Sequence, residues 1–225
     1  MAKKNKQQKH PAAILIGILV ALGLTFAGIQ VPDFLQDLIH SNGASEQPEK
    51  KTSQGKTSQS GDNPGPVEHG EATFSKEELK DNKKGWIHYG DYDDYDRPTA
   101  ANALIKPDMI GTGSSALQEI KPPGFISGLD PHNHSRGHLI GKQLGGSGEE
   151  PKNLVTLYQN PVNTPFMTKY ENMVRKAADN GETIRYRVIP IYEGDIGMPT
   201  AVQMEGKGLS PSSSINFNVT IENKK

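Results

Sequence analysis

Four polar side chains stand in an order that could hydrolyse a phosphate ester. His138 ends a Ser-Arg-Gly-His sequence, and Asn163, Glu171 and Arg175 follow it. Because steps of four residues on a helix return to nearly the same face, Asn163, Met167, Glu171 and Arg175 should form one stripe. A base, a neutral oxygen ligand, a carboxylate and a guanidinium suit hydrolysis of a phosphodiester with one hydrated Mg²⁺. The spacing therefore favours a phosphodiester-cleaving site.

Each of the first two residues has a plainer alternative. His138 is the predicted general base, since a neutral imidazole near its usual pKa can take a proton from water at neutral pH. The alternative is a structural or surface histidine. Asn163 is the predicted metal ligand, through its side-chain carbonyl oxygen, with most of the Mg²⁺ coordination left to water and phosphate. Its alternative is a helix N-cap, and Asn160 is a rival for the ligand role.

Glu171 and Arg175 also have two interpretations. In the catalytic one, Glu171 holds metal-bound waters from behind the metal, and Arg175 pairs with Glu171 or with phosphate. In the other, the two residues form an ordinary helix-surface pair at a spacing of four, which stabilises a helix by only about 0.2–0.5 kcal/mol. The presence of His138 and Asn163 upstream favours the catalytic interpretation.

The ordered set of motifs resembles the DNA/RNA non-specific endonuclease family, one of the ββα-metal (His-Me finger) nucleases. The resemblance is dense from about residue 97 to residue 192. It implies a ββα-metal catalytic unit, and it extends to the membrane-anchored DNA-entry nucleases of Gram-positive bacteria. The motifs that carry it are Arg136-Gly137-His138-Leu139-Ile140-Gly141, Gln143-Leu144-Gly145-Gly146, Asn153-Leu154-Val155-Thr156, Gln159-Asn160-Pro161-Val162-Asn163 and Tyr170-Glu171-Asn172.

The resemblance also assigns two arginines and reveals one departure. Arg97 is similar to the family arginine that contacts the scissile phosphate, and the alternative is a solvated loop arginine. Arg136 either orients the turn before His138 or touches the nucleic-acid backbone. Ser135 stands where many members carry Asp, so Ser135 or a neighbour such as Asp130 must replace that carboxylate.

Two other clusters offer competing chemistry. His132 and His134 could join His138 in a zinc site, but no carboxylate partner is evident. The acidic run 91–96 resembles an incipient Ca²⁺ loop but lacks the glycine and the terminal glutamate of an EF-hand, so a solvated acidic turn is favoured.

The elements around the site indicate an α+β domain with an antiparallel sheet. A helix is predicted over 164–180, with Thr164 as its cap, Pro165 in its first turn and Asn180-Gly181 at its end. Alternating or β-branched runs predict strands on both sides of the helix. These strands cover residues 86–89, 101–105, 183–192 and 214–222.

The N-terminal third predicts an anchor and a tether. Residues 1–11 form a basic cytoplasmic tail with four lysines, and residues 12–30 form an uncharged apolar run that could span a bilayer as a signal anchor. The alternative is a cleaved signal peptide, which would make the protein secreted. Residues 31–68 read as a disordered extracytoplasmic linker, and residues 69–225 as the catalytic domain, outside the cell membrane.

The composition limits which nucleic-acid-binding surfaces and metal sites the protein can have. The net charge of −1 excludes a uniformly basic nucleic-acid-binding protein, so any phosphate-binding surface must be local, and the absence of cysteine excludes disulfides and cysteine-ligated zinc. The expected cofactor is Mg²⁺, with Mn²⁺ as a substitute, and the expected substrate is DNA and, as a second substrate, RNA. The implied role is DNA uptake or nucleotide scavenging; the alternatives are an antibacterial nuclease toxin and a non-catalytic, membrane-bound DNA receptor.

Overall fold

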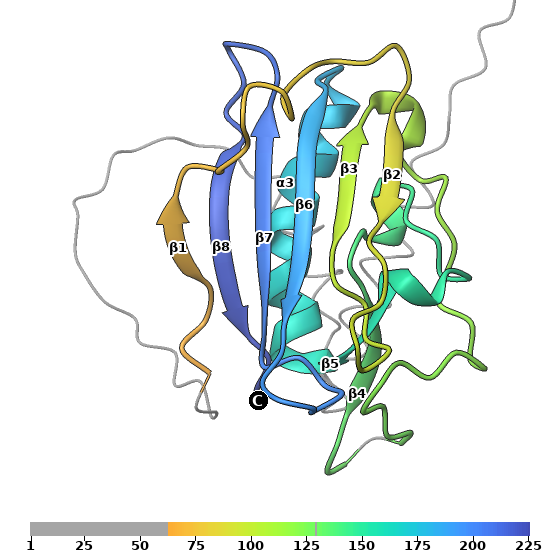
Figure 1. Ribbon diagram of the computed structural model, residues 1–225. Coiled ribbons are helices and arrows are strands. Elements are labelled where there is room, and N and C mark those ends of the chain that lie inside the picture. The colour runs from red at the N-terminus through yellow and green to blue at the C-terminus, as the bar shows by residue number, and fades with distance from the viewer. Residues whose placement is uncertain (1–62, 129) are drawn as a thin grey trace, which may run out of the picture. The chain divides into compact units, whose positions relative to one another are not determined.

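A six-stranded antiparallel sheet forms the body of the domain (Figure 1). The computed structural model describes residues 63–128 and 130–225. The strand order is β1-β8-β7-β6-β3-β2, with every neighbouring pair antiparallel. The strands are β1 (Val67–Gly70), β2 (Trp86–Tyr89), β3 (Ala101–Ile105), β6 (Ile184–Ile191), β7 (Ala201–Gly208) and β8 (Asn216–Glu222).

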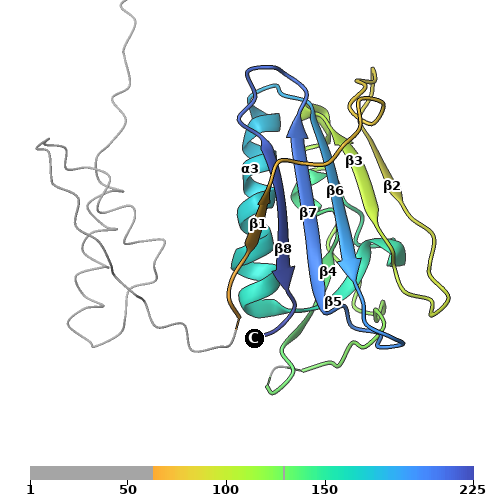
Figure 2. The same ribbon diagram turned by 60° about the vertical axis from the view of Figure 1, so that its left-hand side comes forward.

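A second, two-stranded sheet stands beside the first and leads into a helix. Strands β4 (His134–His138) and β5 (Leu154–Tyr158) form an antiparallel pair. The irregular segment η4 (Gln159–Met167) and helix α3 (Thr168–Asp179) follow directly. Helix α3 lies along one face of the large sheet, as the two views agree (Figure 2). Chain order therefore places two strands and then a helix around the candidate catalytic residues. Three short 3-10 helices complete the structure: η1 (Pro107–Met109), η2 (Lys142–Leu144) and η3 (Pro151–Asn153).

The hydrophobic core lies between α3 and the large sheet, and it follows the predicted alternation. In β8, Phe217, Val219 and Ile221 are buried, whereas Thr220 is only partly so. The predicted strands 86–89 and 101–105 match β2 and β3, and the other two predicted strands contain β6 and β8. The α+β class and the antiparallel sheet are confirmed.

Strand β7 lies near the centre of the sheet, although its sequence did not indicate a strand. Its second half, Glu205-Gly206-Lys207-Gly208, contains two glycines and two charged residues, which disfavour strands. Packing explains one of the glycines, because a Cβ on Gly206 would lie 2.5 Å from the Phe217 ring on β8. Hydrogen bonding to β6 and β8 on both sides overrides the weak local preference.

The predicted helix over 164–180 contains α3, whose regular part starts at Thr168. Thr164, the predicted cap, has extended backbone angles (φ −137°, ψ 125°), as expected of a residue that precedes a helix. The cause is local, since proline disfavours the helical conformation in the residue before it. Both residues with non-helical angles in η4, Asn160 and Thr164, directly precede prolines.

Two arginines of β6, Arg185 and Arg187, are engaged by the protein and do not form a basic surface. Arg185 is only 4% exposed, and its guanidinium lies over the rings of Phe74 and Trp86. Arg187 pairs with the buried Glu205 at 2.8 Å and also lies over Phe74. These two arginines therefore hold the segment before β2 against the sheet and do not offer charge to a ligand.

The folded domain begins earlier than the predicted boundary between residues 68 and 69. Strand β1 pairs with β8 from Val67 onward. Further upstream, the buried Asn63 donates to the backbone carbonyls of Glu222 (3.0 Å) and Lys224 (2.6 Å) and accepts from the Gly65 amide. Residues 63–68 therefore belong to the fold.

The predicted tail 1–11, the predicted span 12–30 and most of the predicted linker lie outside the described residues. Within 63–128 and 130–225, no helix has the length and apolar character needed to cross a bilayer.

Replacing Asn63 with alanine tests the revised boundary. We expect Asn63→Ala to destabilise the domain by about 1–3 kcal/mol, because two partly buried backbone carbonyls lose their donor. Thermal unfolding of the full chain measures the change. His69→Ala is the matched control, since His69 is exposed and should change stability by less than about 0.5 kcal/mol. Equal, negligible effects of both substitutions would place residues 63–68 in the linker after all.

Candidate active site

His138 lies at the end of β4, with one ring nitrogen already engaged. Its Nε2 lies 3.1 Å from the backbone carbonyl oxygen of Ser114. A carbonyl oxygen can only accept, so Nε2 must carry the hydrogen and Nδ1 holds the free lone pair of the neutral ring. This contact fixes the tautomer that a base needs. Sequence reasoning missed Ser114, because a backbone carbonyl leaves no signature in the residue types.

The surroundings of His138 favour its neutral form. Burial lowers the pKa of His138 below its usual 6.5; the Ser114 carbonyl opposes this shift, and the nearby Lys142 ammonium adds to it. The imidazole is therefore uncharged at neutral pH and able to accept a proton.

Alternate residues of β4 hold one loop in place. His134, Arg136 and His138 point to the same side of the strand, and all three contact the segment 114–126. Arg136 donates from Nε to the Ile120 carbonyl (2.6 Å) and from Nη2 to the Gln118 carbonyl (2.7 Å). Arg136 therefore holds the segment 114–126, a role that differs from the predicted orientation of the turn before His138 and from the predicted contact with nucleic acid.

Asn153 fixes the connection between β4 and β5 from inside. Its side chain is fully buried; Oδ1 accepts from the Ile140 amide (2.8 Å), and Nδ2 donates to the carbonyls of Ile140 (3.1 Å) and Ser147 (2.9 Å). These bonds hold the loop 140–147 directly after His138. The motif around Asn153 was noticed in the sequence, but nothing there showed that its amide is buried.

Glu171, in the first turn of α3, faces this loop. Both carboxylate oxygens lie within 2.7 Å of where a Cβ on Gly141 would sit, so a larger residue there would displace the Glu171 carboxylate. Gln143 donates from Nε2 to Glu171 Oε2 at 3.2 Å. Burial raises the pKa of Glu171 to about 7, and the Gln143 hydrogen bond opposes this shift. The carboxyl therefore sits in a site that favours a nearby cation.

Asn163 lies in η4 and not on α3, so the predicted single-helix stripe is wrong. The extended Thr164 separates Asn163 from the helix that carries Glu171. Asn163 donates from Nδ2 to Gln159 Oε1 (3.3 Å), which leaves its carbonyl oxygen available as a ligand. Its rival Asn160 is exposed and extended. Since η4 packs against β4, the fold brings Asn163 to the hairpin by a route other than helical periodicity.

Arg175 does not meet Glu171. Its Nε lies 3.5 Å from the Asp179 carboxylate, one turn further along α3, and both side chains are about half exposed. Glu171 turns inward instead, so the simple surface-pair alternative is also wrong for these two residues. Arg175 is on the surface of α3, where it is accessible to a phosphate.

Arg97 is buried, and its Nε and Nη1 are both engaged by the protein. It is 6% exposed; Nε pairs with Asp93 at 2.8 Å, and Nη1 donates to the carbonyls of Gly194 (2.8 Å) and Ile196 (2.9 Å). Its guanidinium also lies 4.3 Å from the centre of the Tyr192 ring. This geometry favours a structural role, joining two loops, over the predicted phosphate contact. Asp93 likewise stabilises its own turn, as expected of an acidic turn.

The remaining histidines do not assemble a zinc site. His134 and His138 lie four residues apart on one strand, a separation of about 13 Å. Among residues 63–128 and 130–225, no group of three or more His, Cys, Asp or Glu side chains is placed to hold a metal. Ser135, which replaces the family aspartate, donates weakly to the Leu157 carbonyl of β5 (3.4 Å), while Asp130 is exposed.

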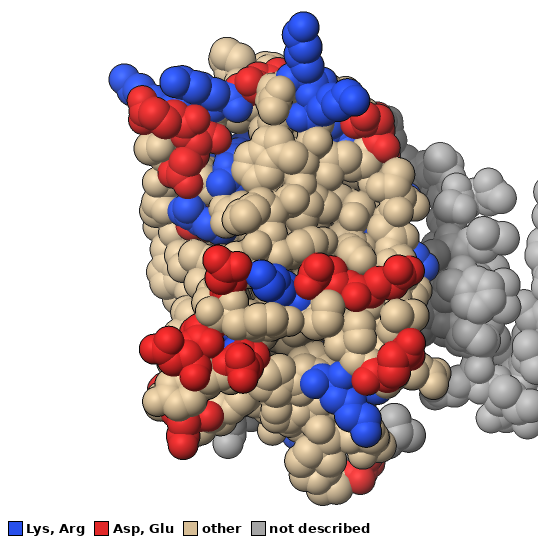
Figure 3. All heavy atoms as spheres, turned by 45° about the vertical axis from the view of Figure 1, so that its right-hand side comes forward, with Lys and Arg blue, Asp and Glu red and all other residues tan. Residues whose placement is uncertain are grey.

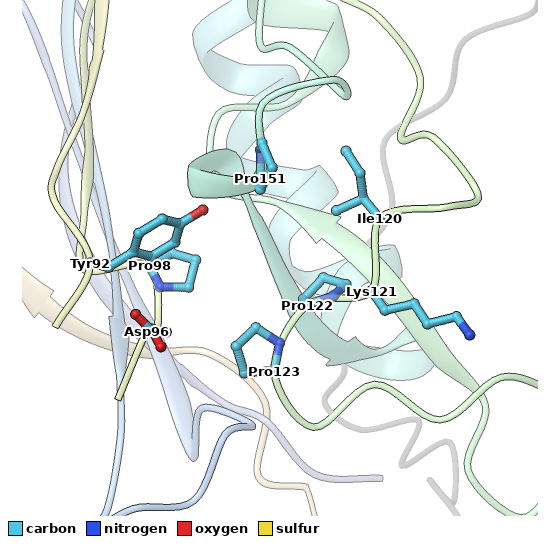
Figure 4. A pocket seen from close by; sticks show the side chains of 8 residues that line it. All are labelled: Tyr92, Asp96, Pro98, Ile120, Lys121, Pro122, Pro123 and Pro151. Carbon is cyan, nitrogen blue, oxygen red and sulfur yellow. The ribbon is translucent and has the colours of Figure 1, made fainter. Parts of the chain in front are cut away.

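A cavity of about 360 Å³ lies behind the loop 114–126, away from these side chains (Figure 4). Tyr92 and four prolines line most of it, and none of the candidate catalytic residues reaches it. The lining residues are Tyr92, Asp96, Pro98, Ile120, Lys121, Pro122, Pro123 and Pro151.

A hairpin whose first strand ends in a histidine, followed by an asparagine and a glutamate-bearing helix, is the arrangement expected of a ββα nuclease. The family comparison agrees: the model described as DNA/RNA non-specific endonuclease matches residues 77–210, more than half of the chain. The chain belongs to this family and is a nuclease.

Solved structures support the same assignment. NucA from Streptococcus agalactiae with magnesium bound is 25% identical, with a TM-score of 0.61, and the match covers 73% of this chain and 85% of NucA. The metal-free NucA structure is 26% identical, with a TM-score of 0.57, 72% of this chain and 80% of that one being covered. The Sda1 nuclease with bound zinc is 19% identical, with a TM-score of 0.55, covering 70% and 89%, which supports the fold alone.

Substitution of Arg97 distinguishes its two roles. We expect Arg97→Ala to cost about 2–4 kcal/mol of folding stability, because Asp93 and two carbonyls lose their partner. Binding of DNA by the folded fraction should keep its salt dependence. If Arg97 contacts phosphate, the slope of log binding constant against log salt concentration should instead fall by about 1. Arg175→Ala is a useful comparison, since Arg175 is exposed and should scarcely alter stability.

Proposed function

We propose that this nuclease is a Mg²⁺-dependent, sequence-nonspecific endonuclease that hydrolyses phosphodiester bonds of DNA, with RNA as a second substrate. The observation that carries the proposal is the contact between His138 Nε2 and the Ser114 carbonyl, which leaves Nδ1 free to act as a base. Nδ1 of His138 removes a proton from the attacking water. The oxygen of that water bonds to phosphorus, and the P–O bond to the leaving oxygen breaks.

The residues present fit a single hydrated Mg²⁺. Asn163 offers a neutral carbonyl oxygen, and Glu171 is a partly buried carboxyl with an amide donor and a raised pKa, a setting that a cation would stabilise. In this arrangement Asn163 would hold the ion, and Glu171 would orient the waters around it. Bound Mg²⁺ would supply stabilisation of the charge that develops on the phosphate oxygens. Mn²⁺, which prefers similar ligands, could replace it. The magnesium-bound NucA from Streptococcus agalactiae supports this choice of ion.

Substrate binding in the proposal relies on local charge. Acidic and basic side chains lie interspersed on the face shown in Figure 3, with large uncharged areas between them. The exposed face of α3 carries three basic residues: Lys169, Arg175 and Lys176. Phosphate contacts of this kind carry no sequence information, which suits a nonspecific nuclease.

We further propose that residues 12–30 anchor the protein in the cell membrane, with residues 1–11 in the cytoplasm and the catalytic domain outside. The four lysines before the apolar run and the absence of charge within it support this orientation. Cleavage of this segment would make the enzyme secreted. The proposed role is DNA uptake or nucleotide scavenging; an antibacterial toxin and a non-catalytic DNA receptor are the alternatives.

Digestion of plasmid DNA and of RNA by the full chain tests the proposal. We expect cleavage with Mg²⁺, none with EDTA, and a loss of several orders of magnitude in His138→Ala, because the base is removed. DNA binding and thermal stability should remain near those of the parent. Retained DNA binding without any cleavage by the parent protein would identify a receptor, and a small effect of His138→Ala would mean that another group is the base.

The pH dependence of cleavage reports on the same residue. Since the pKa of His138 lies below 6.5, its basic form dominates at neutral pH and is lost as the pH falls. At saturating Mg²⁺ we expect kcat/KM to be level from pH 6.5 to 8 and to decline at lower pH. A decline that begins above pH 7 would point to Glu171, whose pKa is raised to about 7, and not to His138 as the group that limits activity.

A further inference from the structure

Four aromatic rings gather at the start of β4, the end of this strand that lies away from His138. The ring centre of His134 on β4 lies 6.3 Å from that of Phe125 and 5.4 Å from that of Tyr158 on β5. The ring of His132 lies beside His134, at 5.5 Å. These four residues form the aromatic row, which joins the loop before β4, β4 itself and the end of β5.

A positive charge lies over two rings of the aromatic row. The Arg136 guanidinium lies 4.3 Å from the centre of the Phe125 ring, and the Lys225 ammonium lies 5.7 Å from the centre of the Tyr158 ring. Among the described residues, neither cation pairs with a carboxylate. The backbone carbonyls that Arg136 contacts do not neutralise its charge, so both charges can act on a phosphate.

Core packing does not account for the aromatic row. The hydrophobic core contains none of its rings, and only Tyr158 packs against the core. All four residues are partly exposed, and neighbouring rings meet at angles of 54°, 60° and 71°, so they do not cover one another face to face. The start of β4 also projects beyond the end of the large sheet in both ribbon views (Figures 1 and 2).

His134 contributes a neutral ring to the row. The Ile126 amide donates to its Nδ1 at 3.2 Å, so Nε2 carries the hydrogen of the neutral ring. Burial lowers the pKa of His134 below 6.5, and His132 and Lys225 lower it further. At neutral pH the row therefore combines uncharged rings with two fixed cations. Proteins that bind single-stranded nucleic acid use the same combination, with rings for the bases and cations for the backbone.

We propose that the aromatic row is a stacking site for the bases of single-stranded nucleic acid. The inference rests on the proposed function and narrows its substrate class. Aromatic side chains bind bases of any sequence, because every base has a π-face. The bases of a duplex are already stacked on one another and do not offer these faces, whereas those of a single strand do. Arg136 and Lys225 would hold the phosphates of the same strand.

Strand β4 sets the distance between base stacking and cleavage. The side chains of His134 and His138 point to the same side of the strand, about 13 Å apart. At about 3.4 Å per nucleotide, the spacing along one strand of B-DNA, this distance takes about four nucleotides, and fewer when the strand is extended. A strand held by the aromatic row can therefore present a phosphate to His138 a few nucleotides away.

Binding of oligonucleotides to the full chain tests the stacking site. Fluorescence anisotropy in EDTA follows an oligothymidylate of about 12 nucleotides and a duplex of the same length. We expect the parent to bind the single strand more tightly than the duplex. Tyr158→Leu should weaken single-strand binding by about ten-fold and duplex binding by less than about two-fold. Tyr158→Phe keeps the ring and should match the parent.

Phe125→Leu provides a second test, with Phe74→Leu as its matched control. Phe74 is also a partly exposed ring beneath an arginine, since the Arg187 guanidinium lies 4.7 Å from its centre. Its segment, between β1 and β2, crosses the end of the large sheet opposite to the start of β4 (Figure 1). We expect only Phe125→Leu to weaken single-strand binding, by about ten-fold, with an unchanged dependence on salt because no cation is removed.

The parent protein distinguishes failure of this inference from failure of the proposed function. If the parent cleaves plasmid DNA but binds the two oligonucleotides equally, or if Phe125→Leu and Phe74→Leu behave alike, only the stacking site is refuted. An equal loss of single-strand and duplex binding in Tyr158→Leu would refute it as well. If the parent neither cleaves nor binds nucleic acid, the proposed function is refuted, and the stacking site with it.

Discussion

The buried amide of Asn153 is the interaction on which the catalytic geometry depends. Three hydrogen bonds from one side chain satisfy the backbone of a loop that has little regular structure of its own. This loop starts immediately after His138 and carries Gly141 and Gln143, the two residues against which Glu171 rests. Buried polar groups are costly unless paired, so a fully paired one specifies a single conformation. The base and the carboxylate therefore share a common support.

The second support is the exchange of contacts between β4 and the loop 114–126. The tautomer of His138 depends on a carbonyl of that loop, and the loop is held by Arg136, two residues before the histidine. Strand β4 thus holds, through Arg136, the same loop whose Ser114 carbonyl fixes the tautomer of His138. Arg97 makes comparable contacts, because it joins the acidic turn that contains Asp93 to the loop after β6. In both cases an arginine that looks free in the sequence is committed to backbone carbonyls.

Sequence reasoning identified the residue types of the site and most of the sheet, because both depend on local patterns. The apolar positions of β8 and the apolar run of β3 directly reflect burial. It misplaced Asn163 because a helical period was extended through Thr164, where proline imposes extended backbone. It missed β7, Asn153, Ser114 and the burial of Arg97 because each depends on partners distant in the chain. Contacts of that kind are decided by tertiary packing and not by the residues alongside.

Asn63 has a consequence for the way this domain can be combined with others. Its side chain joins the first described residues to the carbonyls of Glu222 and Lys224, so the chain enters and leaves the domain at one place. Domains with adjacent ends can be inserted into a loop of a host protein without stretching it, and they tolerate circular permutation. A fusion partner joined to either end of the domain would therefore emerge from the same part of its surface.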